Sequence, residues 1–374
     1  MGSRMKIERV EIRAVAPQVQ RFTWSHDLPD QFSTNTIVRI FTDAGVEGVG
    51  GTWNATSFDF DRYTAETLRH LAPILVGRDP LDRESLRRDL WPRVFPIPAQ
   101  ALAAIDIALW DLAGKASGQP LYKLMDPVRN RIRSYASTPM LDDIPAYLDF
   151  VETLLEQGFT AVKFHTWCVP EQDASLARAV RRKYPGDDVE FMLDAENNYD
   201  RESALWVAKE LETLGFTWFE APLPDYDLEG YRILAQEVEM PVLPSGNWIM
   251  DLSTFEGAVK DGCWRAARTD ALILGGVTPL RKAVDITRAE GVNCEIMSWG
   301  FSLNSTANLH VMLTTDNCSY FEQTMPYEPY EYGMVDVVRT QPDGYVYAPE
   351  KPGLGLDVDW EAMEHATIHS LTFS

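Results

Sequence analysis

The sequence predicts an α/β protein in which a parallel β/α barrel follows a separate α+β domain. Short apolar segments alternate with amphipathic helical segments between about residues 131 and 321, which is typical of a parallel sheet. The chain has 374 residues, which suits a barrel of about 250 residues with an attached domain. Hydrophobic residues make up 45% and charged residues 24% of the chain, so a sizeable core is expected rather than disorder.

Residues 5–128 form the predicted first domain. Lys6 to Val15 is predicted to be a strand, 35–41 a second strand, and a Gly-containing turn at 44–48 leads to a third. The most regular helical pattern runs from Pro98 to Ser117, where apolar residues recur at helical spacing. Strands followed by helices in this way favour a self-contained α+β domain.

Residues 129–335 form the predicted barrel, and 336–374 a C-terminal segment. Predicted strands occur at 160–164, 190–194, 217–220, 241–243, 271–273 and 293–297, with helices such as Arg201 to Leu214 between them. Six or more such units fit a barrel better than a short open sheet. The segment after 335 is rich in turn residues, and we expect it to return to the first domain.

The net charge of −22 makes nucleic acid and anionic membranes poor partners, since binding phosphate needs a positive face. A small anionic substrate would need a local cation, and a metal would serve. No apolar run approaches the roughly 18 residues that cross a bilayer, and the first residues lack the apolar stretch of a secretory signal. The 4 cysteines are far apart and form no CxxC pair, so we expect reduced thiols and a cytoplasmic protein.

Polar residues stand where successive apolar strands end. They are Lys163, His165, Asp194, Glu220, Asn247, Asp270 and Glu322. In a barrel the carboxyl ends of the strands converge on one mouth, and buried carboxylates there need a cation or a partner. Asp194 and Glu220 end adjacent strands, and Asn247 adds a neutral oxygen, a set that suits Mg²⁺. Such an ion can hold a substrate carboxylate and stabilise an enediolate.

Lys163 and His165 are the second group of candidate catalytic residues. Residues i and i+2 on a strand share a face, so both side chains can point into the barrel. His165 is the candidate base, because an imidazole titrates near neutral pH. Lys163 can offset the charge of a bound carboxylate or lower the proton affinity of a neighbouring base.

These motifs resemble the enolase superfamily, and its mandelate racemase-like branch most of all. The matching segments are Lys-x-His at 163–165, Leu-Asp-Ala at 193–195, Trp-Phe-Glu-Ala-Pro at 218–222, and the stretches 103–115 and 270–278. The resemblance covers nearly the whole chain. It implies a modified (β/α)8 TIM barrel with an N-terminal α+β capping domain completed by the C-terminal tail. It also implies one Mg²⁺ per subunit, a small carboxylate substrate and a homo-oligomer, from dimer to octamer.

The resemblance also implies a role for each site residue. Asp194, Glu220 and Asn247 match or fall near the metal ligands, Lys163 and His165 match a Lys-x-Lys pair, Asp270 matches the Asp of a His-Asp dyad, and Glu322 matches an acid that hydrogen-bonds the substrate carboxylate. Glu196 stands where Asn is usual. Trp53, Asn54 and the 22–26 stretch lie in loops that close over the site and select substrate, and Trp299 is either a substrate contact or a packing residue.

One departure from the family pattern narrows the reaction. The dyad His would fall at Met297, which cannot exchange a proton. Racemisation, which needs a base on each face of the carbon, is therefore disfavoured. The sequence predicts an aldonate or aldarate dehydratase in which His165 serves as both base and acid in a syn elimination. Two alternatives stay open: a lactone cycloisomerase or other one-base isomerase, and a barrel that binds a metal or ligand but has lost catalysis.

Overall fold

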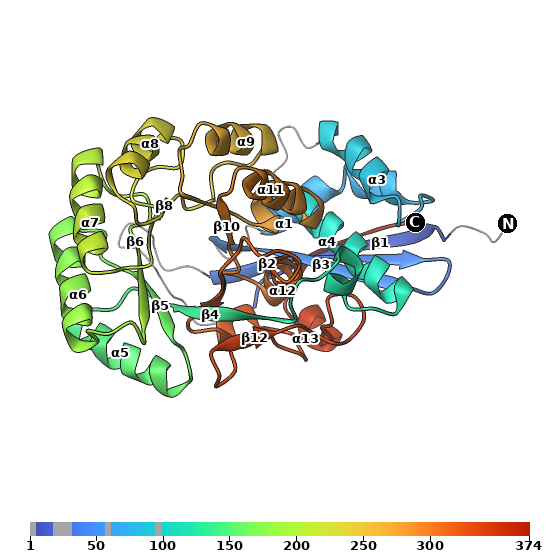
Figure 1. Cartoon of the computed structure of the whole chain (residues 1–374). Coiled ribbons are helices and arrows are strands. Elements are labelled where there is room, and N and C mark those ends of the chain that lie inside the picture. Colours follow the sequence, from blue (N-terminus) through green and yellow to red (C-terminus); the bar gives the residue numbers. More distant parts are fainter. Residues whose placement is uncertain (1–4, 18–31, 57–60, 94–98) are drawn as a thin grey trace.

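The computed structural model describes residues 5–17, 32–56, 61–93 and 99–374. An antiparallel sheet with its helices lies at one end of the molecule and a parallel α/β barrel at the other (Figure 1). The predicted fold class, a barrel with an α+β capping domain, is confirmed. Within the described residues, no helix combines the length and apolar character needed to cross a membrane.

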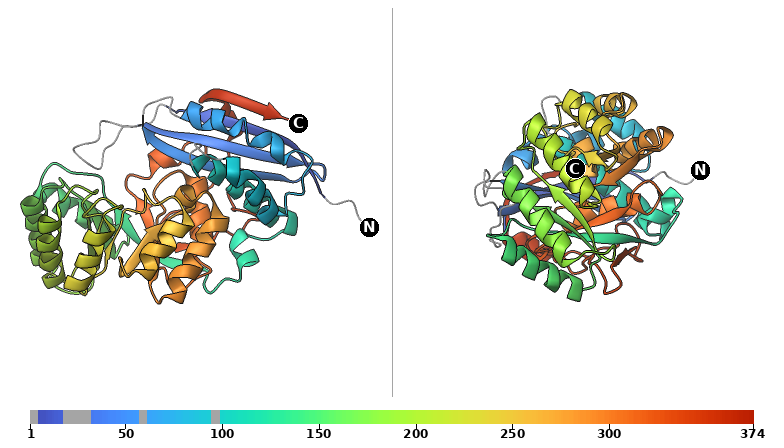
Figure 2. Two further views of the ribbon diagram at one scale, coloured as in Figure 1. Left: turned by 90° about the horizontal axis from the view of Figure 1, so that it is seen from above. Right: turned by 60° about the vertical axis from the view of Figure 1, so that its left-hand side comes forward.

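The sheet of the first domain takes one strand from the end of the chain. Its order is β13-β1-β2-β3, with every neighbouring pair antiparallel. The strands are β1 (Ile7–Val15), β2 (Phe32–Thr42), β3 (Glu47–Thr56) and β13 (Thr367–Phe373). Figure 2 shows the red C-terminal strand lying along the blue sheet. The expected return of the tail is therefore seen in β13, whereas the domain boundaries themselves stay predictions.

The helices of the first domain pack on this sheet or on one another. They are α1 (Asp61–Leu68), α2 (Ala72–Leu75), α3 (Arg83–Leu90), the 3-10 turn η1 (Trp91–Arg93) and α4 (Ala99–Ser117). Helix α4 contacts β3 directly, and a Cβ atom on Gly50 would lie 2.2 Å from the backbone oxygen of Ala104. Only glycine at position 50 allows this approach.

Eight strands in chain order form the barrel: β4 (Arg131–Ser137), β5 (Ala161–His165), β6 (Glu190–Asp194), β7 (Trp218–Glu220), β8 (Val242–Leu243), β9 (Ala266–Thr269), β10 (Asn293–Ile296) and β11 (Tyr320–Thr324). Parallel ladders join β11-β4-β5-β6-β7-β8 and, separately, β9-β10. A short strand of the tail, β12 (Tyr345–Tyr347), pairs with β4. All eight strands run the same way, so their carboxyl ends meet at one mouth.

Helices follow the barrel strands. They are α5 (Ile144–Glu156), α6 (Pro170–Lys183), α7 (Arg201–Thr213), α8 (Leu228–Glu237), α9 (Leu252–Lys260), α10 (Ala271–Leu274), α11 (Val277–Ala289) and α12 (Ser302–Met312); α13 (Trp360–His365) and the 3-10 turns η2 (Leu121–Met125) and η3 (Glu328–Tyr330) lie outside this series. Asp143, Asp200, Asp227 and Asp251 each cap the helix that follows. An Asp side chain satisfies a free N–H group of the first turn, so these residues mark the helix starts.

The predicted strand at 271–273 is wrong, because those residues form α10. The Asp270 carboxylate accepts a hydrogen bond from the Ile273 N–H at 2.8 Å, and Gly275 ends the helix with φ of 81°. These two caps stabilise a single helical turn in an otherwise strand-like apolar run. The strand is β9, which ends just before Asp270, and it contains the charged residue Arg268 in a buried position.

His310 links the barrel to the C-terminal segment and should make stability depend on pH. The Tyr122 N–H donates to Nδ1 (3.1 Å), and Nε2 lies 3.0 Å from the Leu354 oxygen, to which it donates. Burial lowers the pKa of this imidazole from 6.5 to about 4. The unfolded chain therefore binds the proton first, so the stability due to neutral His310 is present above pH 6.5 and is lost as the pH falls toward 4, by about 3 kcal/mol in total.

The prediction is tested by urea unfolding across this pH range. His310→Gln keeps one donor and one acceptor but has no proton to gain, so its free energy of unfolding should fall less than that of the parent protein. Parallel curves for the two proteins would show that His310 does not carry this dependence.

Candidate active site

A cavity of about 450 Å³ opens at the carboxyl ends of the barrel strands. The predicted site residues that the structure describes line it: Trp53, Asn54, Lys163, His165, Asp194, Glu196, Glu220, Asn247, Asp270, Trp299 and Glu322. Met297 and Arg268 line it too. The predicted 22–26 stretch lies outside the described residues. The structure thus brings the described candidates together in one place, while the role of each stays a prediction.

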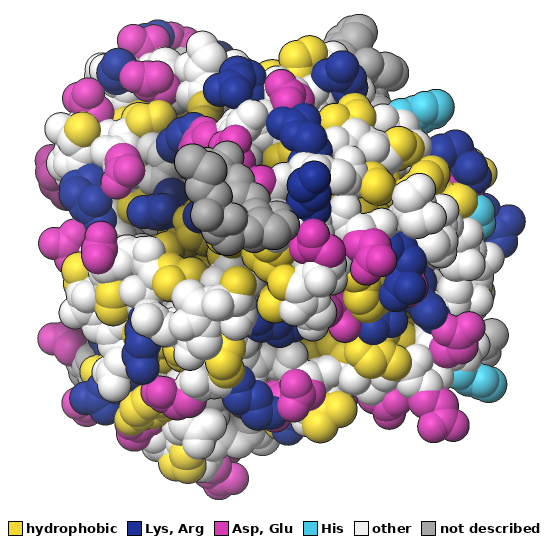
Figure 3. Space-filling model, turned by 90° about the vertical axis from the view of Figure 1, so that its right-hand side faces the viewer, with side chains coloured by type: hydrophobic (Ala, Val, Ile, Leu, Met, Phe, Trp, Pro, Cys, Tyr) yellow, Lys and Arg dark blue, Asp and Glu magenta, His cyan; other side chains and the backbone are white. Residues whose placement is uncertain are grey.

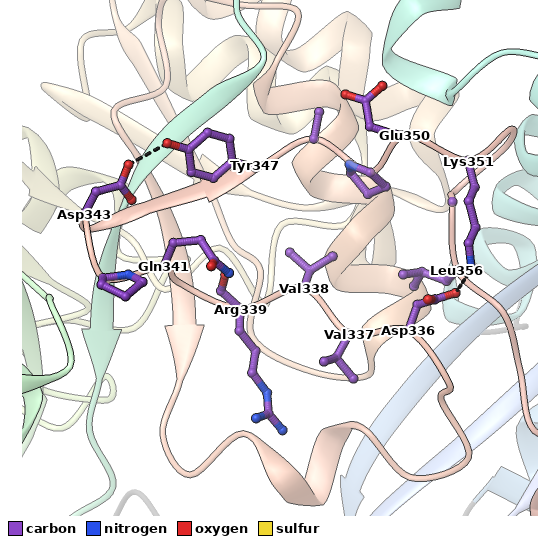
Figure 4. A pocket seen from close by; sticks show the side chains of 14 residues that line it. Asp336, Val337, Val338, Arg339, Gln341, Asp343, Tyr347, Glu350, Lys351 and Leu356 are labelled. Atoms are coloured by element: carbon purple, nitrogen blue, oxygen red, sulfur yellow. Dashed lines mark hydrogen bonds and ion pairs between the residues drawn. The ribbon is translucent and has the colours of Figure 1, made fainter.

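A second hollow lies in the C-terminal segment between residues 336 and 356 (Figure 4). Its basic residues are already paired: Lys351 with Asp336 and Asp357, and Arg339 with Glu331. On the face shown in Figure 3, basic side chains are scattered among acidic ones rather than gathered in one patch. The cavity at the barrel mouth is therefore the candidate active site.

Lys163 stands at the centre of the charged residues in this cavity. Its Nζ lies 3.0 Å from Asp194 Oδ2, 2.7 Å from Glu220 Oε1 and 2.9 Å from Glu322 Oε1. Burial by itself would lower the pKa of the ammonium, but the surrounding carboxylates raise it well above its usual value. The surrounding carboxylates therefore favour the ammonium form of Lys163.

Arg268 is a second buried cation, and the sequence analysis missed it. Its Nε lies 2.8 Å from Glu220 Oε1, and its Nη2 lies 2.6 Å from Glu322 Oε2 and 3.3 Å from the Tyr135 hydroxyl. The guanidinium comes from β9, where residue 268 is two positions before Asp270 and so shares its inward face. Arg268 could therefore have been predicted from the sequence, because it lies two residues before the predicted site residue Asp270.

His165 is held in one orientation by the backbone. Its Nδ1 lies 2.6 Å from the Thr138 oxygen and donates to it, so Nε2 faces the cavity. Nε2 lies 3.3 Å from Asp194 Oδ2 and 3.2 Å from Glu196 Oε1, and the ring packs edge-on against Trp299. Burial would lower the pKa of the imidazole, but the hydrogen bonds to Asp194 and Glu196 outweigh it and raise the pKa to about 10.

Glu196 completes a histidine–carboxyl pair. Its backbone adopts the left-handed conformation with φ of 49°, and its N–H donates to Asp194 Oδ1 at 3.0 Å. Burial and the nearby Asp194 charge raise the pKa of the Glu196 carboxyl. The side chains of His165 and Glu196 can therefore share one proton, and the neutral imidazole that remains when Glu196 holds it can act as a base.

The two glutamates that contact Lys163 differ in their proton affinity. Burial raises the pKa of Glu220 to about 8. Burial acts on Glu322 in the same direction, but Lys163 and Arg268 outweigh it and lower the pKa of Glu322 to about 2. In this arrangement each oxygen of Glu322 faces a cation, and its role as the acid that hydrogen-bonds the substrate carboxylate stays a prediction.

Asp270 and Met297 are the two positions at which the resemblance predicts a His-Asp dyad. Asp270 accepts hydrogen bonds from the Asn304 and Asn308 side chains, at 3.2 and 3.3 Å, in addition to capping α10. Burial raises the pKa of Asp270 to about 6. The Asn308 side chain also donates to the Met297 carbonyl at 2.9 Å. Asparagine amides thus hold Asp270, and the thioether of Met297 adds no acid or base to this side of the cavity.

The capping domain contributes Trp53 and Asn54 to the cavity wall. Asn54 Nδ2 donates to Asp61 at 3.1 Å, and the Trp53 ring packs edge-on against Tyr330. Trp299 donates from Nε1 to the Tyr330 hydroxyl at 2.8 Å. Tyr330 therefore connects the indole of the capping domain with the indole that covers His165.

Gly300 should be essential for this contact between domains. A Cβ atom there would lie 1.8 Å from Trp53 Nε1, and the residue has φ of 126°. Gly300→Ala is expected to destabilise the protein by about 2–3 kcal/mol, through the clash and the backbone strain together. Thermal or urea unfolding measures this, with Gly291→Ala as the control, because Gly291 also has positive φ but has no atom near the added Cβ. An equal loss in both variants would remove the clash as the cause.

The residues expected to hold Mg²⁺ do not fit that ion as they are arranged. Both oxygens of Glu220 already face nitrogen groups: Oε1 faces Lys163 and Arg268, and Trp218 Nε1 donates to Oε2 at 3.2 Å. Both oxygens of Asp194 are likewise engaged, Oδ1 by the Glu196 N–H and Oδ2 by Lys163 and His165. A hard cation would have to displace these groups.

The surroundings of Asn247 and His165 also argue against a Mg²⁺ site. Asn247 is exposed, and its backbone N–H donates to Asp225 Oδ2 at 3.1 Å. Among the described residues, the His165, Asp194 and Glu196 side chains have ligand atoms within 4.8 Å of one another. An imidazole with two carboxylates suits a transition-metal ion better than Mg²⁺, and coordination would remove the Nε2 lone pair from proton transfer. We therefore draw no chemical step through a metal.

Two family models match the chain. The mandelate racemase/muconate lactonizing enzyme N-terminal domain matches residues 10–126, and the enolase C-terminal domain-like model matches residues 146–362. The chain belongs to the enolase superfamily. Its predicted resemblance to this superfamily, and its assignment as an enzyme, are confirmed.

Relatives in the enolase superfamily include named dehydratases. A D-galactonate dehydratase family member of Streptomyces bingchenggensis is 28% identical, over 86% of this chain and 87% of its own, and a D-galactonate dehydratase of Ralstonia nicotianae is 29% identical, over 86% and 88%. A Pseudovibrio sp. structure, provisionally described as a mandelate racemase/muconate lactonizing enzyme, is 39% identical with a TM-score of 0.96, over 99% and 100%. The D-glucarate dehydratase of Agrobacterium tumefaciens complexed with magnesium is 28% identical with a TM-score of 0.85, over 98% and 100%.

Proposed function

We propose that this chain is an acid-sugar dehydratase that removes the proton beside the carboxylate of an aldonate or aldarate and expels the β-hydroxyl as water. The observation that carries the proposal is His165, whose Nε2 faces the cavity beside Lys163 while Nδ1 is held by the Thr138 oxygen. The names of the relatives, D-galactonate dehydratase and D-glucarate dehydratase, support the same substrate class.

The reaction needs one base that later acts as an acid. His165 Nε2 takes the α-proton, the Cα–H bond breaks, and its electron pair forms an enediolate next to the cations Lys163 and Arg268. The electron pair then forms a Cα–Cβ double bond while the Cβ–O bond breaks. The departing hydroxyl takes a proton from the same imidazole and leaves as water. The enol product becomes a 2-keto-3-deoxy acid.

The remaining assignments belong to this proposal. Lys163 offsets the charge of the substrate carboxylate, and Trp53, Asn54 and Trp299 contact the rest of the sugar acid. The Agrobacterium relative is complexed with magnesium, but the expected Mg²⁺ on Asp194, Glu220 and Asn247 does not fit the contacts that these residues make here, and no step above uses it. A cytoplasmic location and a homo-oligomer also stay predictions.

A panel of aldonates and aldarates in D₂O tests the proposal. NMR follows exchange of the α-proton, and a second assay detects 2-keto-3-deoxy acids. Exchange together with water loss in one panel member is the expected result. Exchange with an isomerised product would indicate a one-base isomerase instead. Binding without exchange across the panel would contradict catalysis by His165.

A further inference from the structure

Two basic side chains share the carboxylates at the base of the cavity. Lys163 Nζ and Arg268 Nε lie 2.7 and 2.8 Å from the same atom, Glu220 Oε1. They also contact different oxygens of Glu322: Lys163 lies 2.9 Å from Oε1 and Arg268 lies 2.6 Å from Oε2. Two glutamates from different strands, β7 and β11, are thereby joined through two side-chain cations.

Lys163 and Arg268 together carry the same charge as a divalent ion, and they are buried as such an ion would be. The side chains of Lys163, Arg268, Glu220 and Glu322 are each at most 3% exposed, so solvent does not screen them. An ammonium and a guanidinium, each facing two of these carboxylate oxygens, together supply two positive charges. Burying them is favourable only because the carboxylates face them.

We infer that Arg268 and Lys163 together take the place of a divalent cation in this chain, so that the barrel mouth binds a carboxylate substrate without a metal ion. The positive charge beside the enediolate then comes from side chains of β5 and β9. The substrate class rests on the proposed function, whereas the replacement of the ion rests only on the contacts of Arg268 and Lys163.

The inference makes a testable statement about Mg²⁺ itself, with no substrate present. The purified protein should contain no stoichiometric divalent metal by elemental analysis. Adding MgCl₂ after chelation should leave its melting temperature unchanged. Arg268→Ala frees Glu220 Oε1 and Glu322 Oε2 from the guanidinium, so this variant should melt lower in chelator and should regain about 2–4 °C or more on saturation with Mg²⁺.

Three further variants make the result specific. Arg268→Lys keeps a cation at this position, so Mg²⁺ should leave its melting temperature unchanged. This variant also provides a test if Arg268→Ala does not fold. Arg268→Ala combined with Glu220→Gln should lose the response. Arg133→Ala is the matched control, because Arg133 also pairs with a barrel glutamate, Glu190, at 2.8 Å, but comes from β4 and does not contact Glu220 or Glu322.

A saturable rise in melting temperature with Mg²⁺ in the parent protein, with one ion per chain, would overturn the inference. Loss of that rise in Glu220→Gln would locate the ion at the carboxylates assigned here to Arg268. Loss in Glu196→Gln alone would locate it at His165, Asp194 and Glu196, which equally overturns a metal-free site. If the acid-sugar panel shows no exchange but Arg268→Ala gains Mg²⁺ binding, the proposed function fails and the inference stands.

Discussion

Replacing His165 by alanine is expected to lower kcat by about 10²–10⁴-fold and to abolish α-proton exchange in D₂O, because a positioned acid–base group contributes about that factor. His165 Nε2 faces the cavity, and Met297 provides no substitute base. The carboxylates that contact Nε2 remain in the variant, but their orientation depends on the missing imidazole. Kinetics on the substrate found in the panel, together with NMR exchange, measure the loss.

Two controls separate chemistry from folding in this experiment. Asp194 keeps its contact with Lys163 when the imidazole is removed, so His165→Ala should retain a cooperative unfolding transition. His70→Ala removes an exposed histidine from the capping domain and should leave both activity and stability unchanged. Exchange at the parental rate in His165→Ala would eliminate His165 as the base.

Replacing Lys163 by methionine is expected to cost about 3–5 kcal/mol of stability at neutral pH, since it leaves buried carboxylates without their cation. Methionine fills most of the volume of the lysine stem, so the loss reports on charge rather than on a cavity. Three carboxylates contact Lys163, and each becomes easier to protonate without it. The variant should therefore recover part of its relative stability as the pH falls.

A surface ion pair of similar length provides the comparison. Lys209 Nζ lies 2.8 Å from Glu237, but both side chains are about half exposed. Lys209→Met should change the free energy of unfolding by about 0–1 kcal/mol, and its effect should shrink further in salt. Urea unfolding of both variants at neutral and acidic pH measures the difference. Similar values for Lys163→Met and Lys209→Met would refute the central role of Lys163 in the buried cluster.

The sequence was most informative where a strand follows a regular pattern. The predicted strand at 190–194 matches β6 residue for residue, and the prediction for 217–220 differs from β7 by one residue. The carboxyl ends of these strands share one mouth, so their polar residues could be placed together without coordinates. The prediction missed strand β9 because this strand contains a charged residue, Arg268, which interrupts the apolar pattern. For the same reason Arg268 was not predicted as a site residue.

Contacts between distant elements were beyond the reach of sequence patterns. Nothing local to Glu322 indicates that both its oxygens face cations, since Lys163 and Arg268 come from other strands. Asp270 was predicted from a family motif as a dyad member, yet its described partners are the amides of Asn304 and Asn308, on α12. Side-chain pairing of this kind depends on tertiary packing, which periodicity does not encode.

The pairing of β1 with β13 has a consequence for the order in which the molecule can form. Val10 pairs with Phe373, which lies much later in the sequence, so β1 is synthesised long before the strand that pairs with it. Until then the edge of β1 that β13 will cover presents unpaired N–H and C=O groups, which are a template for association with other chains. The barrel can assemble during synthesis, whereas the sheet of the capping domain closes only after it. Removing 367–373 should consequently yield a protein prone to aggregate, even though this segment is far from the chemistry in sequence.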